Sequence, residues 1–185
     1  MGVKNRDEIA WEAKTLNVCE TERVILRPFS ETDGAFIIEL LNDESFIRNI
    51  ADKKIRSLND AVSYLRNGPM ISYQQYGFGL YLVVLKTTNT PIGMCGIVKR
   101  EELAYPDLGY AFLPRYWGKG YAFESAKAVL EYAKHSLRLN LLLAVTLPNN
   151  EKSNRLLIKL GFSRIGEVEL YQLPNNLYEN KMDEL

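Results

Sequence analysis

The chain has 185 residues, and its 23 lysines and arginines balance 23 aspartates and glutamates, so the formal net charge is zero. This length and an ordinary apolar content indicate one globular domain, and the neutral balance argues against a nucleic-acid binder that works through bulk charge. A single histidine, His135, excludes a multi-histidine metal site, and two cysteines, Cys19 and Cys95, cannot build a disulfide framework. We therefore expect neither a metal nor a nucleic acid among its ligands.

The ends of the chain carry no recognisable targeting signal. The first residues are too charged for a signal peptide, and no apolar run approaches the roughly 20 residues of a membrane span. We therefore expect a cytoplasmic protein without membrane contact, as a monomer or a homodimer. Residues 1–18 are expected to form an N-terminal arm, and residues 19–185 a single domain.

Two helix starts are predicted in the first third of the chain. Residues 21–29 are rich in strand formers, and Pro28 ends that strand. Capping-box spacing then occurs twice, and apolar residues follow each box at helical intervals. The boxes are Ser30 with Asp33 and Ser57 with Asp60. The second helix is expected to be interrupted at residues 67–69, Asn-Gly-Pro.

The second part of the chain alternates between strand and helix patterns. The strands are expected over 78–86, 92–100, 107–113, 139–147, 162–168 and 177–181, with helices over 118–137 and from Asn149 or Asn150 to Leu160. Strand 107–113, the helix after it and strand 139–147 form a parallel crossover, right-handed by the usual rule. The fold class is therefore α+β, a mixed and mostly antiparallel sheet with a central parallel strand pair and flanking helices.

The turn between strand 107–113 and the next helix is the most informative segment. Its sequence is Arg-Tyr-Trp-Gly-Lys-Gly-Tyr-Ala over residues 115–122. Gly118 and Gly120 let the backbone approach a ligand closely, and the free N–H groups of a helix start favour an anion such as a pyrophosphate. Arg115 and Lys119 could add charge. The spacing matches neither a Walker loop nor a dinucleotide fingerprint, and an ordinary strand-to-helix turn stays open on the glycines alone.

The surrounding motifs resemble the GNAT N-acetyltransferase superfamily. Arg-x-x-Gly-x-Gly follows a strand that ends in residues 109–113, Gly-Tyr-Ala-Phe-Leu. Residues 149–162 then have the pattern Asn-x-x-x-Ser-Asn-x-x-Leu-x-Lys-Leu-Gly-Phe. Together with the opening Glu-Arg-Val-Ile-Leu-Arg-Pro of residues 22–28, they are similar to the RimJ/RimL-like branch, the ribosomal-protein N-terminal acetyltransferases. The resemblance covers roughly residues 20–170; the leading arm and a short, polar final strand depart from it.

The resemblance implies a fold in which the two parallel strands splay apart and hold acetyl-CoA. The pantetheine arm of acetyl-CoA would lie in the gap and pair with the backbone of Ala111, Phe112 and Leu113. The pyrophosphate would lie over the turn formed by Arg115, Tyr116, Trp117, Gly118, Lys119 and Gly120. Asn149 would hydrogen-bond the cofactor arm, with helix capping as its alternative role.

The same resemblance implies direct attack of an amine on the thioester, without a covalent enzyme intermediate. A backbone N–H within 109–112 would serve the oxyanion, and Ser153, also placed at the cofactor, would act as the general acid. Glu101 is favoured as the base, with Asp107 and a water relay as alternatives. The acceptor would be a protein N-terminal amine or a small-molecule amine. The alternative function is a non-catalytic acyl-CoA-binding sensor or interaction module.

Three other features carry weaker expectations. Cys95 is expected to be a small buried residue, and His135 to lie on the surface near a helix end. Lys53, Lys54 and Arg56 form a basic cluster that is expected to be solvated. In the RimL-like branch this region borders the acceptor cleft.

Overall fold

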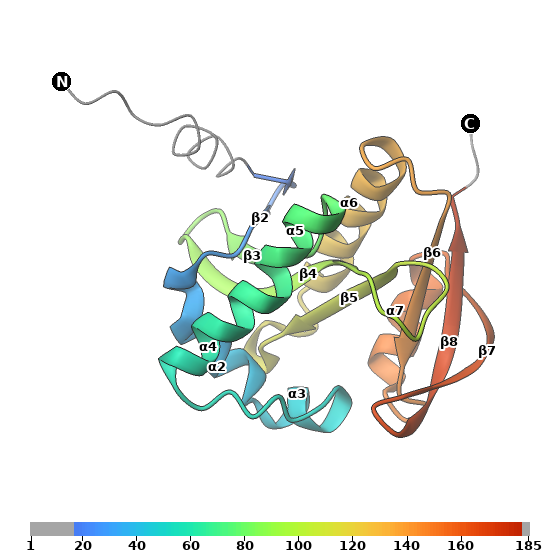
Figure 1. Ribbon diagram of the computed structural model, residues 1–185. Helices are drawn as coiled ribbons and strands as arrows, with labels where there is room; N and C mark the ends of the chain where they lie inside the picture. Colours follow the sequence, from blue (N-terminus) through green and yellow to red (C-terminus); the bar gives the residue numbers. More distant parts are fainter. Residues whose placement is uncertain (1–16, 183–185) are drawn as a thin grey trace.

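The structure, a computed structural model, describes residues 17–182 (Figure 1). Most of the expected arm, residues 1–18, lies outside this range. The strands are β1 (Cys19–Glu20), β2 (Val24–Arg27), β3 (Leu80–Leu85), β4 (Thr90–Val98), β5 (Asp107–Phe112), β6 (Leu141–Thr146), β7 (Ser163–Leu170) and β8 (Leu173–Lys181). The helices are α2 (Gly34–Leu41), α3 (Glu44–Asn49), α4 (Leu58–Leu65), α5 (Ile71–Tyr76), α6 (Tyr121–His135) and α7 (Glu151–Lys159). Short helical turns are η2 (Glu31–Asp33), η3 (Arg66–Met70) and η4 (Pro114–Tyr116).

The strands form one sheet in the order β1-β2-β3-β4-β5-β6-β8-β7. Every neighbouring pair is antiparallel except β5 and β6, which run parallel and are joined through α6. The predicted fold class is therefore confirmed, including its central parallel pair.

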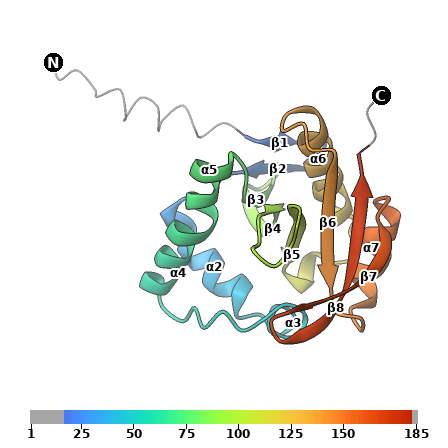
Figure 2. The ribbon, with the colours of Figure 1, turned by 45° about the vertical axis from the view of Figure 1, so that its right-hand side comes forward.

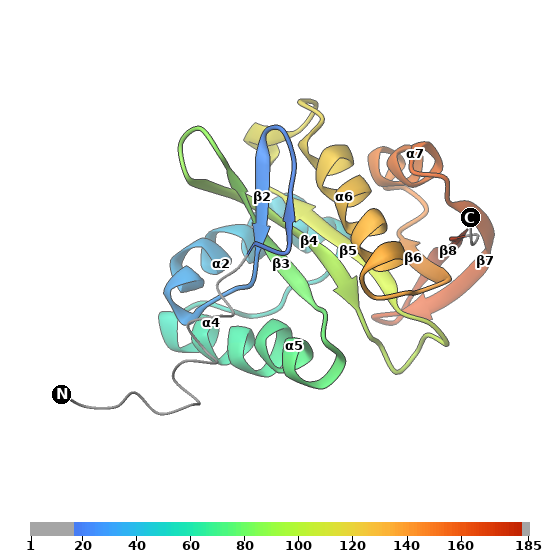
Figure 3. The ribbon, with the colours of Figure 1, turned by 90° about the horizontal axis from the view of Figure 1, so that it is seen from above.

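Helices cover both faces of the sheet (Figure 3). Alternate residues of β3 and β4 face opposite sides, as the period of a strand requires. Val83 and Ile97 belong to the core beneath α6 and α7, whereas Leu82 and Met94 belong to the core beneath α2 and α4. Two apolar layers therefore fix the sheet between the helices, and β5 lies at its centre.

Four local features differ from the prediction. A short strand, β1, precedes the first predicted strand, and α3 follows α2 without a predicted pattern of its own. The interruption expected at residues 67–69 changes the helix type without breaking the helical path: α4 ends at Leu65, Pro69 lies inside the π turn η3, and the chain continues into α5. The wider π turn there tolerates a residue that lacks an N–H donor. Strand β8 begins at Leu173, earlier than predicted, and lies inside the sheet between β6 and β7.

Strands β5 and β6 are paired only at one end. Asp107 lies opposite Leu143, whose N–H donates to the carbonyl of Pro106 at 2.9 Å, and no further pair joins the two strands. On its other side β5 pairs with β4 along its whole length. The Leu113 N–H donates to Ile92 of β4 at 3.1 Å. Because backbone groups alternate sides in such a ladder, those of Phe112 and Tyr110 face the widening gap. The backbones of Ala111 and Leu113, which were predicted to pair with the cofactor, face β4 instead.

Candidate active site

The gap between β5 and β6 opens into a cleft of about 1130 Å³. Its walls are β5, the start of α6 and the first turn of α7 on one side, and α3 with the α4–α5 segment on the other. The tip of the β7–β8 hairpin lies beside α3 at the bottom of both side views (Figures 1 and 2). The cleft therefore runs along β5, from the glycine turn near residues 118–120 to the hairpin tip.

The glycine turn supplies free backbone donors at one end of the cleft. Gly118 and Gly120 have φ angles of 71° and 86°, in the left-handed region that glycine tolerates best. Gly120 is the N-cap of α6 and has no side chain to bond the first turn, whose N–H groups belong to residues 121–123. Those N–H groups and the positive end of the helix dipole favour an anion there.

An arginine from the β1–β2 turn holds the glycine turn in place through hydrogen bonds. Arg23 donates to the carbonyl of Lys119 at 2.9 Å and to Glu124 of α6 at 2.7 Å, and it lies 4.6 Å from the ring centre of Tyr121. Thr21 donates to the same Glu124 carboxylate at 2.6 Å. Burial raises the pKa of Glu124, but the hydrogen bonds from Thr21 and Arg23 outweigh it and hold the pKa below its ordinary value. The turn is thus tied to the start of α6 by an ionised pair.

The cations near the turn differ from those predicted. Arg115 points to Glu39, with 2.7 Å between the charged atoms, and does not line the cleft. Lys119 contributes its carbonyl rather than a cleft-lining side chain. Lys152 of α7 lines the cleft instead, with its ammonium 4.8 Å from the ring centre of Trp117. The Trp117 indole donates to the Phe112 carbonyl at 2.7 Å and so anchors the turn to the end of β5.

The start of α7 places two asparagines and one serine at the cleft. Asn150, not Asn149, is the helix cap, and its side chain accepts the Ser153 N–H at 3.3 Å. Asn149 is exposed and lines the cleft, as does Ser153. The hydroxyl of Tyr110 on β5 donates to the Ser153 carbonyl at 3.4 Å across the gap. Tyr110 was not predicted as a site residue, although its place beside Gly109 in the motif strand was a usable signal.

A half-buried amide holds this first turn in place. The Asn154 side-chain oxygen accepts hydrogen bonds from Thr146 at 2.5 Å, Tyr178 at 2.7 Å and Asn176 at 3.2 Å. Its amino group donates to the Leu147 carbonyl at 3.3 Å. One side chain therefore fixes α7 to the end of β6 and the middle of β8, and with them the positions of Asn149 and Ser153.

The two predicted base candidates have opposite environments. Asp107 is 1% exposed, lines the cleft and accepts from the Arg100 Nε at 2.9 Å. Burial raises the pKa of Asp107 to about 6, although Arg100 acts in the opposite direction. Glu101 is exposed in the β4–β5 loop and does not line the cleft. The structure therefore brings Asp107 to the site with Tyr110 and Ser153 but leaves the favoured base, Glu101, outside it.

Other expectations concern residues away from this site. Cys95 is a free, buried cysteine, as predicted, and His135 is exposed beside Glu131 near the end of α6. Within residues 17–182, no helix is long and apolar enough to cross a membrane, and no group of three or more potential metal ligands is found.

Sequence comparisons identify the family of this fold. Residues 23–163 match the acetyltransferase (GNAT) domain. The chain is 30% identical to the protein YkkB of Bacillus subtilis over 167 residues, which cover 87% of this chain and 94% of YkkB. It is 28% identical to the N-acetyltransferase YoaA of the same organism, over 85% of this chain and 89% of YoaA. A shorter match, 33% identical over 36% of this chain and 34% of the relative, is to the [ribosomal protein uS5]-alanine N-acetyltransferase of Escherichia coli.

Solved structures share the fold at lower sequence identity. RimL, the ribosomal L7/L12 α-N-protein acetyltransferase in complex with coenzyme A, has a TM-score of 0.78 at 15% identity and covers 91% of this chain and 99% of RimL. The microcin C7 self-immunity acetyltransferase MccE, in complex with acetyl-CoA and AMP, has a TM-score of 0.76 at 17% identity over 91% and 99% of the two chains. A GNAT-family acetyltransferase from Bacillus anthracis has a TM-score of 0.75 at 23% identity over 90% and 99%.

The chain therefore belongs to the GNAT family of acetyltransferases. The predicted family and enzyme class are confirmed, and the similar proteins include ribosomal-protein N-terminal acetyltransferases, as the resemblance implied.

Proposed function

We propose that this acetyltransferase moves the acetyl group of acetyl-CoA to a primary amine, with a peptide or protein N-terminus as the favoured acceptor. The observation that carries the proposal is the continuity of the cleft. It joins a glycine turn with free N–H groups, a strand edge with unpaired backbone groups, and a buried carboxylate at the opposite end.

The residues at the turn and in the gap fit acetyl-CoA. A Cβ added at Gly118 would meet nothing within 4 Å, so its place is open to a ligand. The pyrophosphate would lie on the N–H groups of residues 121–123, with Lys152 nearby. The pantetheine arm would pair with the Tyr110 carbonyl, the Phe112 N–H and the Asn149 side chain. When bound, acetyl-CoA supplies the activated acetyl group, and this chain orients it.

The same residues would move protons during the transfer. Asp107 would accept the proton of the ammonium, directly or through a water, because it is ionised above its pKa of about 6. Ser153 would donate a proton to the departing sulfur, and the Tyr110 N–H would stabilise the oxygen of the acetyl group. The β4–β5 pairing has no register shift. The free N–H therefore arises from the splaying of β5 and β6 rather than from a bulge.

An amine panel tests this function. Purified protein is mixed with acetyl-CoA and an N-terminal peptide, a polyamine or an aminoglycoside, and the release of free CoA thiol is followed. We expect release that depends on both amine and enzyme. Tight acetyl-CoA binding without thiol release for any amine would instead support the non-catalytic sensor.

Removing Arg23 is expected to weaken acetyl-CoA binding without slowing the saturated reaction. Glu124 lies one helical turn from the free N–H groups, and Arg23 neutralises its carboxylate. In Arg23→Ala that carboxylate faces the pyrophosphate, so we expect Kd for acetyl-CoA to rise about tenfold, or about 1.4 kcal/mol, measured by calorimetric titration.

Two further variants separate charge from folding. Adding Glu124→Gln to Arg23→Ala should recover much of the affinity, because it removes the repelling charge. Arg66→Ala breaks an exposed ion pair with Glu31 elsewhere and should leave Kd unchanged. A normal Kd in Arg23→Ala would refute the role assigned to Arg23.

The raised pKa of Asp107 gives two pH dependences. As a base Asp107 must be ionised, so kcat/KM should fall below about pH 6, and Asp107→Asn should lose this fall and be slower at neutral pH.

The second pH dependence concerns stability. The folded state holds the proton of Asp107 more tightly than the unfolded state does. The free energy of unfolding contributed by this group therefore decreases as pH rises from 3.8 to about 6. Thermal unfolding of both proteins across this range checks the second effect, and a wild-type slope equal to that of Asp107→Asn would contradict it.

A further inference from the structure

The end of the cleft opposite the glycine turn carries four residues from four different segments, which we call the distal cluster: Arg48, Lys53, Arg100 and Tyr171. All four line the cleft. The Tyr171 hydroxyl accepts from Arg100 Nη1 at 2.7 Å and from Lys53 Nζ at 3.2 Å, and the Lys53 ammonium lies 4.3 Å from the centre of the tyrosine ring. Burial raises the pKa of Tyr171, but Arg100 and Lys53 outweigh it and lower the pKa overall. The phenol therefore lies in a positive field.

The backbone beneath Tyr171 is strained. Leu170 pairs with Leu173, so Tyr171 and Gln172 alone form the β7–β8 turn. Both have positive φ, 54° and 62°, where asparagine and glycine are preferred. A bulky residue in this region is strained, and such strain clusters at functional sites. The turn aims the phenol into the cleft despite this strain.

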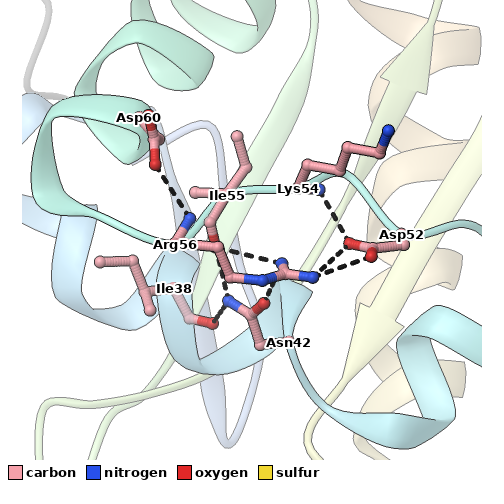
Figure 4. A network of polar contacts seen from close by, with 7 residues as sticks. All are labelled: Ile38, Asn42, Asp52, Lys54, Ile55, Arg56 and Asp60. Atoms are coloured by element: carbon pink, nitrogen blue, oxygen red, sulfur yellow. Dashed lines mark hydrogen bonds and ion pairs between the residues drawn. The ribbon is translucent and has the colours of Figure 1, made fainter.

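A polar network orders the loop that carries Lys53 (Figure 4). The Asn42 side chain donates to the carbonyls of Ile38 and Ile55, both at 2.7 Å, and its oxygen accepts from Arg56. Arg56 also pairs with Asp52 at 2.8 Å, and Asp52 accepts the Lys54 N–H at 2.8 Å. The loop is thus tied to the end of α2, and Lys53 is presented from a fixed backbone.

The charges at this end do not balance. Its cleft-lining cations are Arg48, Lys53, Lys99 and Arg100, and its carboxylates are Asp43 and Asp107. Asp107 is bound by Arg100, and Asp43 caps α3 by accepting the Ser45 N–H at 2.9 Å. No ion pair formed within residues 17–182 uses Arg48 or Lys53. Two positive charges therefore face the cleft without a carboxylate, an arrangement that repels a polycation and attracts an anion.

We propose that Arg48, Lys53 and Tyr171 form a subsite for a carboxylate carried by the acceptor amine. The acceptor is then a primary amine with a nearby carboxylate, either an acidic residue close to a peptide N-terminus or the carboxylate of a free amino acid. This inference rests on the proposed function and adds the substrate class to it. The Lys53 ammonium would exchange its contact with the phenol oxygen for a charge-assisted one with the carboxylate.

Matched peptides test the subsite. Three peptides differ only in glutamate, glutamine or lysine at the second position, and a fourth arm uses free glutamate; kcat/KM is measured by thiol release. For the wild type we expect the glutamate peptide to exceed the glutamine peptide by about tenfold or more, because a charge-assisted hydrogen bond is made. The lysine peptide should be the poorest. Activity of the free amino acid, compared with that of the glutamate peptide, identifies the source of the carboxylate.

Variants assign the preference to Lys53. Lys53→Met should remove the glutamate preference, Lys53→Glu should reverse it toward the lysine peptide, and Lys54→Met is the control because Lys54 does not line the cleft. Acetyl-CoA affinity should stay normal in all three. Equal turnover of the three wild-type peptides, or a preference that survives Lys53→Glu, would overturn the subsite and leave the acetyltransferase function standing. Absence of turnover with every amine would instead count against the proposed function.

Discussion

Gly118→Val is expected to abolish measurable acetyl-CoA binding while the protein stays folded. Gly118 has a φ of 71°, and an added Cβ would point into open space rather than into the protein. In the proposed complex that space belongs to the pyrophosphate. A branched side chain there would displace the phosphates from the N–H groups of residues 121–123. Because each hydrogen bond to a charged group contributes about 1.5–3 kcal/mol, losing two of them weakens binding by a hundredfold or more.

The chain offers a matched control for this substitution. Gly77 ends α5 with a φ of 77°, and a Cβ there also meets nothing within 4 Å, but Gly77 does not line the cleft. Gly77→Val should therefore lower the melting temperature about as much as Gly118→Val and leave acetyl-CoA affinity unchanged. Gly120→Val should behave like Gly118→Val, with added crowding against Arg23 at 3.2 Å. Normal acetyl-CoA affinity in a folded Gly118→Val protein would contradict the proposed position of the cofactor.

Ser153→Ala is expected to lower kcat by about a hundredfold or more, the usual loss for a positioned proton donor. The Asn150 cap bonds the Ser153 N–H and not its hydroxyl, so the substitution should leave α7 intact. Acetyl-CoA affinity and the melting temperature should therefore change little. Steady-state kinetics with saturating acetyl-CoA and the best amine measures the effect.

Two other variants that lack a hydroxyl group provide an alternative acid and a control for that experiment. Tyr110→Phe removes the second hydroxyl at the gap, and a loss of kcat there with full activity in Ser153→Ala would move the acid to Tyr110. Ser125→Ala removes a buried hydroxyl in α6 that has no hydrogen-bond partner. It should leave kcat unchanged and raise stability slightly, because a buried group without a partner is lost.

The sheet and its crossover could be predicted because they depend on local hydrophobic period. Residues 139–147 are apolar on both faces, which predicts a strand covered on both sides. The strand β6 has four of its six residues buried and the other two partly buried, as that pattern indicates. The turn with Gly118 and Gly120 was equally readable, since only glycine accepts two left-handed positions so easily. The two strands of the last hairpin were predicted in part, but its turn at Tyr171 and Gln172 was missed, because that turn has neither glycine nor asparagine at its two central positions.

Side-chain direction limited the prediction of the site. Arg115 follows β5 directly, but the helical turn η4 sends it toward Glu39 on α2. Glu101 was favoured as the base because the resemblance places a glutamate near the end of the preceding strand. That strand, β4, ends at Val98, and the loop carries Glu101 into solvent. Lys53 reaches Tyr171 across 118 residues of sequence, a contact that no local pattern could indicate.

The central claim is that the splayed strands bring acetyl-CoA and an amine together for direct transfer. The most direct measurement counts the acetylated amine and the free CoA thiol in one reaction, with mass spectrometry of the protein afterwards. The account predicts equal amounts of both products and no acetyl group on the protein. Thiol release without an acetylated amine, or an acetyl group retained on the protein during turnover, would contradict it.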